Sequence, residues 1–145
     1  LLLIDNEYFT CVIRKKTKIE GNIIYKYLNN SKTYFRIKKL YNKTLHSFDF
    51  VPRMKFNDKK LEIKEDYIKN VLSRKNKPKN YKQQLINIYK MFRKNNLYHN
   101  ELLGEHIRVK GDKIFIIDFD QTYPYKTNSV KASQKIKNII ARYSY

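Results

Sequence analysis

Histidines and carboxylic acids gather in the C-terminal half at a spacing that could serve metal binding or proton transfer. The stretch YHNELLGEHIRV at 98–109 holds His99, Glu101 and His106, and the apolar run IFII ends at Asp118. Carboxylate and imidazole groups are the side chains that proteins most often use to hold metal ions and to move protons. These residues are therefore the first candidates for chemistry, and the surrounding elements must bring them together.

A lysine in the N-terminal half is a further candidate because of its neighbours. The segment IIYKYL at 23–28 has the β-branched and aromatic composition of a strand. Side chains alternate between the two faces of a strand, so Lys26 shares its face with Ile24 and Leu28. A lysine among apolar side chains is either a snorkelling surface residue or a residue placed for contact with an anion.

The rest of the chain alternates short strands and helices. Two helices are expected, one at 31–42 with Ser31 as N-cap and one at 80–95 with Asn80 as N-cap and Gln83 in a capping box. Expected strands and turns lie at 1–5, 8–15, 17–22 (a turn), 23–28, 50–56, 61–65, 106–109 and 114–118, and a last helix at 128–143. This order predicts a single α+β domain.

The composition is strongly basic, with a formal net charge of +19 over 145 residues. One interpretation is a nucleic acid or another anionic partner, bound through a basic surface such as the loop 74–82. The other is codon usage, since Lys, Asn, Ile and Tyr all have A/T-rich codons. Most of the cations are Lys, whereas base recognition favours Arg, so we favour the second interpretation.

Cellular location is constrained only by absences. No apolar run approaches the length of a membrane span, and the segment at 1–5 is too short for the core of a signal peptide. Cys11 is the only cysteine, which excludes an internal disulfide. We expect an intracellular, cytoplasmic protein without a membrane span, and an A/T-rich source such as a large DNA virus would account for the composition.

The order of elements around 98–120 resembles the catalytic half of the protein-kinase-like superfamily. The superfamily pattern is H-R-D-L-x-x-x-N followed by D-F-G. Here His99 to Leu102 match the first part in spacing, His106 stands at the Asn position, and Asp118, Phe119 and Asp120 stand at D-F-G. A histidine at the Asn position is similar to kinases of the lipopolysaccharide-core type.

The resemblance implies a truncated kinase-like fold, with a small antiparallel sheet lobe at 1–65 and a reduced helical lobe at 66–145. It implies that Lys26 contacts ATP phosphates, that Asp118 holds Mg²⁺ or Mn²⁺ with His106, and that Glu101 orients the acceptor hydroxyl. Glu65 and Tyr67 would lie beside the adenine. His99 would mainly brace the loop.

Departures from the superfamily pattern leave the function open. Glu101 replaces Asp, Asp120 replaces Gly, and no glycine-rich loop is visible. The helix 31–42 has no Glu to pair with Lys26, so we expect weak, metal-dependent nucleotide binding. Three functions remain: an atypical ATP-dependent phosphotransferase with an unidentified acceptor, a catalytically inactive pseudokinase serving as a binding or virion module, and a basic nucleic-acid-binding protein.

Overall fold

The computed structural model describes residues 15–99, 104–120, 122–124, 137–138 and 140–141. The chain divides into two compact units, Leu1–Tyr67 and Ile68–Tyr145. Within the described residues, both contain short antiparallel strands and a long helix, so the predicted α+β class is confirmed. Each unit is described by itself.

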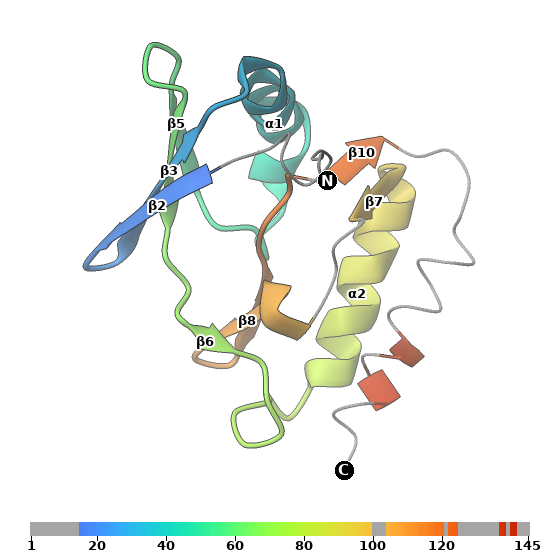
Figure 1. Cartoon of the computed structure of the whole chain (residues 1–145). Coiled ribbons are helices and arrows are strands. Elements are labelled where there is room, and N and C mark those ends of the chain that lie inside the picture. Colours follow the sequence, from blue (N-terminus) through green and yellow to red (C-terminus); the bar gives the residue numbers. More distant parts are fainter. Residues whose placement is uncertain (1–14, 100–103, 121, 125–136, 139, 142–145) are drawn as a thin grey trace, which may run out of the picture. The chain divides into compact units, whose positions relative to one another are not determined.

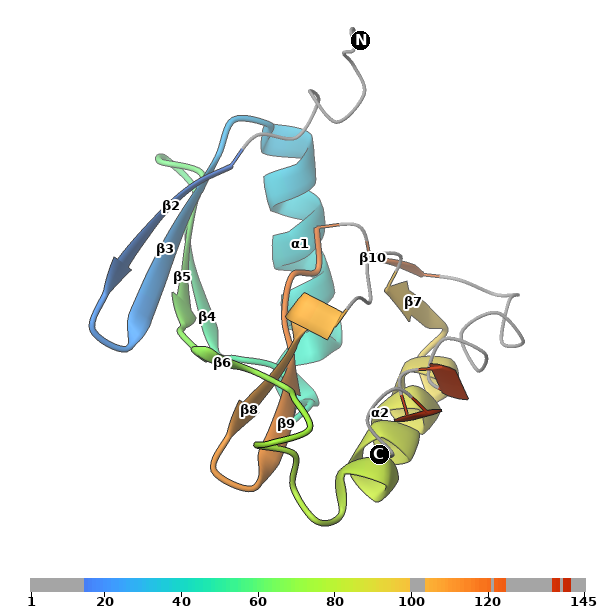
Figure 2. The ribbon, with the colours of Figure 1, turned by 60° about the horizontal axis from the view of Figure 1, so that its bottom comes forward.

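A four-stranded antiparallel sheet forms the centre of the first unit. Its strands are β2 (Lys15–Glu20), β3 (Ile23–Leu28), β4 (Met54–Asn57) and β5 (Glu62–Asp66), in the order β2-β3-β5-β4. Figure 1 labels β2, β3 and β5, and Figure 2 also labels β4. The strand predicted at 23–28 therefore lies in the same sheet as the strands predicted at 50–56 and 61–65, as expected. In this register Tyr25 lies opposite Lys18 on one side and Lys64 on the other.

Helix α1 (Ser31–Lys43) covers one face of this sheet (Figure 2). It buries Tyr34, Ile37 and Leu40 at helical spacing, and the Tyr34 ring meets Phe56 of β4 edge-on at 5.9 Å. The cap is one residue earlier than predicted: the Asn30 side chain accepts a hydrogen bond from the backbone N–H of Thr33 at 3.0 Å. Asn30 and Ser31 are both good capping residues, so the sequence alone does not separate them. A short 3-10 helix, Leu45–Ser47, follows.

The turn predicted at 17–22 is shorter in the structure. Strand β2 continues to Glu20, and the chain reverses at Gly21, whose φ is +59°. Thr17 and Ile19 are β-branched and fit a strand, whereas the left-handed backbone at the reversal favours glycine.

The second unit combines helix α2 with small sheets. Its elements are α2 (Tyr81–Lys94), the 3-10 helix Gly104–His106, and the strands β6 (Asn70–Val71), β7 (Leu97–His99), β8 (Ile107–Lys110), β9 (Lys113–Ile116) and β10 (Thr122–Pro124). One sheet has the order β6-β8-β9, and β10 pairs with β7. Ile107, Val109, Ile114 and Ile116 are buried on one face of the β8-β9 hairpin.

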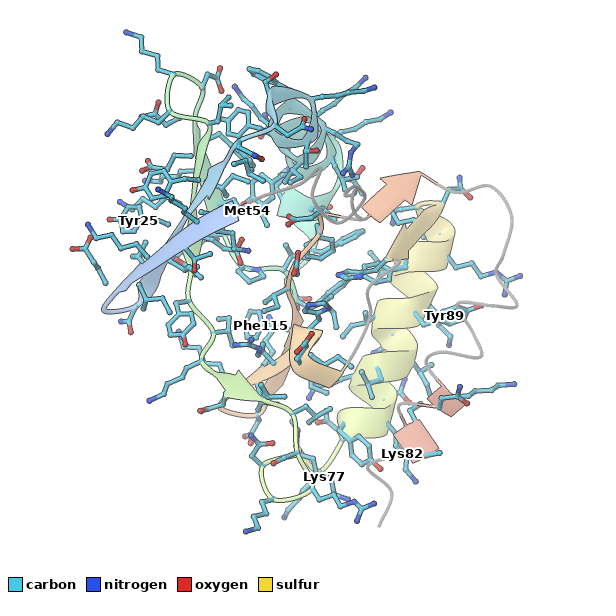
Figure 3. All side chains as sticks on the ribbon, in the orientation of Figure 1. Tyr25, Met54, Lys77, Lys82, Tyr89 and Phe115 are labelled. Atoms are coloured by element: carbon cyan, nitrogen blue, oxygen red, sulfur yellow. The ribbon has the colours of Figure 1, made fainter. Side chains whose placement is uncertain are left out.

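Gln84 joins α2 to the β8-β9 hairpin. Its Nε2 donates to the carbonyl of Asp112 at 2.7 Å, and its Oε1 accepts from the N–H of Ile114 at 2.8 Å. The expected capping box is not formed, because Gln83 bonds Asn87 in the next turn instead. The predicted helix itself is confirmed, and Figure 3 shows Tyr89 on it, half-buried.

Three of the predicted elements fall wholly or largely outside the described residues. They are the strands at 1–5 and 8–15 and the last helix at 128–143, of which only 137–138 and 140–141 are described, in helical conformation. In the described part of the chain, no helix has both the length and the apolar character that crossing a bilayer requires.

Candidate functional site

A buried ion pair occupies the face of the first unit's sheet that α1 covers. Lys26 of β3 and Glu65 of β5 are diagonal neighbours on the same face of the sheet. Lys26 is opposite Ile63, and Glu65, two residues further along β5, is opposite Ile24. The Lys26 Nζ lies 3.0 Å from the Glu65 Oε1. The two side chains are only 9% and 4% exposed, so solvent screens this pair far less than a surface pair.

The expectation that Lys26 lacks a carboxylate partner is wrong. Helix α1 supplies none in its first turn, as its sequence indicated, and its Lys38 instead contacts Asp58 at 2.8 Å. The partner comes from the adjacent strand. The period-2 alternation of EIKED in β5 is the signal that could have found it, because it places Glu65 on the same face as Ile63.

A pocket of about 360 Å³ lies at the end of β5 within the same unit. Glu65 and Asp66 line it, and they belong to the segment predicted to lie beside an adenine. The other lining residues are Ile23, Tyr41, Arg53, Met54, Lys55 and Lys64. Tyr67, the third residue of that segment, is half-buried, and its backbone N–H donates to the carbonyl of Asn22 at 2.8 Å.

The second unit brings His106 and Asp118 together. His106 ends the 3-10 helix Gly104–His106, and Asp118 follows β9 with a φ of +66°, a conformation that few non-glycine residues adopt. The His106 Nε2 lies 3.2 Å from the Asp118 Oδ2, with side chains 11% and 22% exposed. Glu105 is more distant, at 3.8 Å from the same nitrogen, and is largely exposed.

His99 supports this pair from the interior. Its Nε2 donates to the carbonyl of Ile117 at 3.0 Å, directly before Asp118. Its ring centroid lies 5.8 Å from that of His106 and 5.2 Å from that of Phe119. His99 therefore holds the backbone on which the Asp118 carboxylate is mounted.

Arg108 fixes the start of the second unit and was not singled out from the sequence. Its Nη1 donates to the carbonyl of Ile68 at 2.9 Å and to that of Lys69 at 3.3 Å, while its Nε donates to the carbonyl of Glu105 at 2.8 Å. The sequence offered one indication of this role: Arg108 lies in the predicted strand HIRV, on the face opposite to that of Ile107 and Val109.

The predicted site residues thus form two clusters, one in each unit. Lys26, Glu65 and Tyr67 belong to the first unit, and His106 and Asp118 to the second. Glu101 lies outside the described residues. Among the described residues, no group of three His, Cys, Asp or Glu side chains is arranged to hold a metal ion.

We expect His99 to make the second unit sensitive to acid. Burial lowers the pKa of His99; the nearby His106 also lowers it, while Asp118 and the Ile117 carbonyl act in the opposite direction. The unfolded chain takes up a proton near pH 6.5 and the folded chain only at lower pH, so the free energy of unfolding falls as the pH decreases from about 7 to about 5.

The contribution of this histidine is at most about 1.4 kcal/mol per pH unit. Chemical denaturation of the wild type and of His99→Gln at several pH values measures it. The variant is expected to be less stable at neutral pH and to lose stability more slowly on acidification. Equal slopes in the two proteins would show that His99 titrates alike in both states.

Comparisons with known proteins support the fold and reach no further. No protein-family model matches the sequence, and no curated protein matches it significantly. Among solved structures, the chain is similar to Rio2 kinase of Chaetomium thermophilum in a complex with ADP, Mg²⁺ and phosphoaspartate, with a TM-score of 0.53 and 13% identity. The match covers 90% of this chain and 55% of that chain, so this chain spans little more than half of that kinase. The predicted kinase-like fold is confirmed.

Proposed function

We propose that the protein is an atypical phosphotransferase that uses ATP and a divalent cation, Mg²⁺ or Mn²⁺, on an acceptor still to be identified. The observation that carries the proposal is the contact between His106 and Asp118, at 3.2 Å, in a chain with a protein-kinase-like fold. The similar Rio2 kinase was solved with ADP and Mg²⁺, which fits a nucleotide and a magnesium ion as cofactors here.

In this proposal the residues of each unit have distinct tasks. Asp118 holds the cation, Lys26 contacts the phosphates, Glu65 and Tyr67 border the nucleotide, and Glu101 orients the acceptor hydroxyl. A bound divalent cation neutralises the charge that builds up on the transferred phosphoryl group. The ion pair with Glu65 supports the role of Lys26, because it holds the flexible ammonium group in one position.

His106 can serve the site in two ways. Imidazole can ligate a transition metal directly, in keeping with its predicted role as a metal ligand. The observed contact also supports a positioning role, in which the ring N–H donates to the Asp118 carboxylate and fixes its orientation. A histidine at this position also fits the proposed similarity to lipopolysaccharide-core kinases, and the A/T-rich composition fits an origin in a large DNA virus.

A second candidate is a catalytically inactive, kinase-like binding module. Asp120, which replaces the glycine of D-F-G, favours it, because it adds a charge and removes the backbone freedom that glycine has at this position. Metal-dependent nucleotide binding separates the candidates only in part, whereas turnover of ATP separates them fully.

Thermal unfolding with ATP and either Mg²⁺ or Mn²⁺ tests the proposal. We expect a rise in the melting temperature that needs both nucleotide and metal and saturates with ATP concentration, since a ligand bound only by the folded protein stabilises it. ATP with EDTA and metal without ATP are the controls. Absence of any shift in either metal, together with no ADP formation, would reject the phosphotransferase.

A further inference from the structure

The face of the first unit's sheet that points away from α1 is built around an aromatic ring between lysines. We call it the outer face; its members come from alternate positions of the four strands. Tyr25 lies opposite Lys18 on β2 and Lys64 on β5, and Lys55 of β4 lies opposite Lys64. The Nζ atoms of Lys18 and Lys64 lie 6.0 and 5.9 Å from the centre of the Tyr25 ring. Figure 3 marks Tyr25 on this sheet.

A second ring continues the pattern along the same strand. Tyr27 is two residues after Tyr25 and so projects from the same face, at a Cα separation of about 7 Å. Lys16 lies opposite it on β2 and Glu62 on β5. The Tyr27 hydroxyl donates to Glu62, an interaction that raises the pKa of the phenol and anchors its edge.

Acidic residues of the outer face lie beside the lysine row or are already paired. Glu20 contacts Lys18 at 3.5 Å near the β2-β3 turn, and Asp66 contacts Arg53 at 3.0 Å at the end of β5. The row through Tyr25 contains only cations besides the ring. The face therefore offers half-buried aromatic rings with positive charges beside them.

We infer that the outer face binds single-stranded nucleic acid without sequence preference. Every base has a π-face that can stack on a tyrosine ring, and lysines beside the rings can contact the phosphates. A β-sheet that presents aromatic side chains on one face is a known kind of surface for binding unstacked bases. This inference goes beyond the proposed phosphotransferase and does not depend on it, because it uses none of the residues assigned to ATP or the metal.

A lipid surface fits the same face less well. Insertion into a bilayer needs an apolar side of a helix or loop, whereas here charged side chains stand on both sides of each ring. An acidic protein would be attracted by the lysines but would not require an aromatic ring. The dependence of binding on the rings is thus the feature that distinguishes nucleic acid from other anions.

Fluorescence anisotropy with a labelled single strand of about 12 nucleotides tests the role of the ring. We expect Tyr25→Leu to weaken binding by about 5- to 150-fold, since it removes the stacking surface and keeps apolar bulk, while Tyr25→Phe binds like the wild type. Thermal melting of both variants verifies that each is folded. Unchanged affinity of folded Tyr25→Leu would overturn the inference.

A matched pair of charge variants tests the location. Lys18→Gln/Lys64→Gln removes two cations from the outer face, and Arg74→Gln/Lys75→Gln removes two from the exposed basic loop of the second unit. The first is expected to reduce the slope of log K against log salt by about 1.4, and the second to leave it unchanged. Equal losses in the two variants, or binding of heparin or anionic vesicles that also requires Tyr25, would overturn it.

Discussion

Replacing Asp118 with Asn should abolish both metal-dependent binding of ATP and its turnover. The substitution keeps the size of the side chain and removes the charge that would hold the cation against the phosphates. Isothermal titration with ATP and Mg²⁺ or Mn²⁺, followed by an assay of ADP formation, measures both effects. His106 is expected to remain in place, because an Asn oxygen can still accept a hydrogen bond from the His106 Nε2, which lies 3.2 Å from the Asp118 Oδ2.

The matched variant is Glu101→Gln, which should lower the rate while leaving ATP binding nearly intact. A group that orients the acceptor acts mainly in the transition state, so its loss affects turnover more than affinity. Glu101→Asp shortens the side chain to the usual length and is expected to retain activity. Turnover that survives both Asp118→Asn and Glu101→Gln would place the chemistry on other residues.

Breaking the ion pair between Lys26 and Glu65 should destabilise the first unit by about 3 to 5 kcal/mol. Either Lys26→Met or Glu65→Leu leaves one charge buried under α1 without its counterion, at side-chain exposures of only 9% and 4%. The double variant Lys26→Met/Glu65→Leu removes both charges and should recover most of the stability. Denaturant titration of the four proteins gives the coupling free energy.

The exposed ion pair between Arg53 and Asp66 is a control, because Asp66 belongs to β5, the strand that also carries Glu65. Arg53 is 86% exposed, so Arg53→Met should change the free energy of unfolding little. The stable double variant at Lys26 and Glu65 then has a further use. If it folds and no longer binds ATP, the loss belongs to the missing side chains of Lys26 and Glu65 and not to unfolding. A coupling free energy near zero would show that the pair is not a unit.

Much of the fold could be predicted because local signals agree with it. The run IIYKYL has β-branched and aromatic residues at both faces, and β3 is observed at 23–28 as expected. The apolar stripe of the second helix ends at Phe92, and α2 ends two residues later. The departures are the cap at Asn30, the turn at Gly21 and the missing capping box at Gln83. All three concern the ends of elements, where neighbouring residues offer similar propensities.

The candidate site was harder to predict because its contacts are long-range. The partner of Lys26 lies on another strand and is chosen by register, which a single sequence does not specify. Asp118, which pairs with His106, has a left-handed backbone conformation. An aspartate in the sequence does not predict that conformation. The roles of Lys26, Glu101, His106 and Asp118 in catalysis stay predictions until the variants are measured.

The buried ion pair also has a consequence for how the sheet avoids misfolding. A slip of β3 by one residue against β5 would turn Tyr25 and Tyr27 inward and carry Lys26 to the solvent side. Glu65 would then be buried beneath α1 without a counterion. Hydrophobic side chains alone tolerate such errors, since one apolar contact can substitute for another. A lone interior charge does not, so this pair penalises mispaired sheets more than it stabilises the correct one.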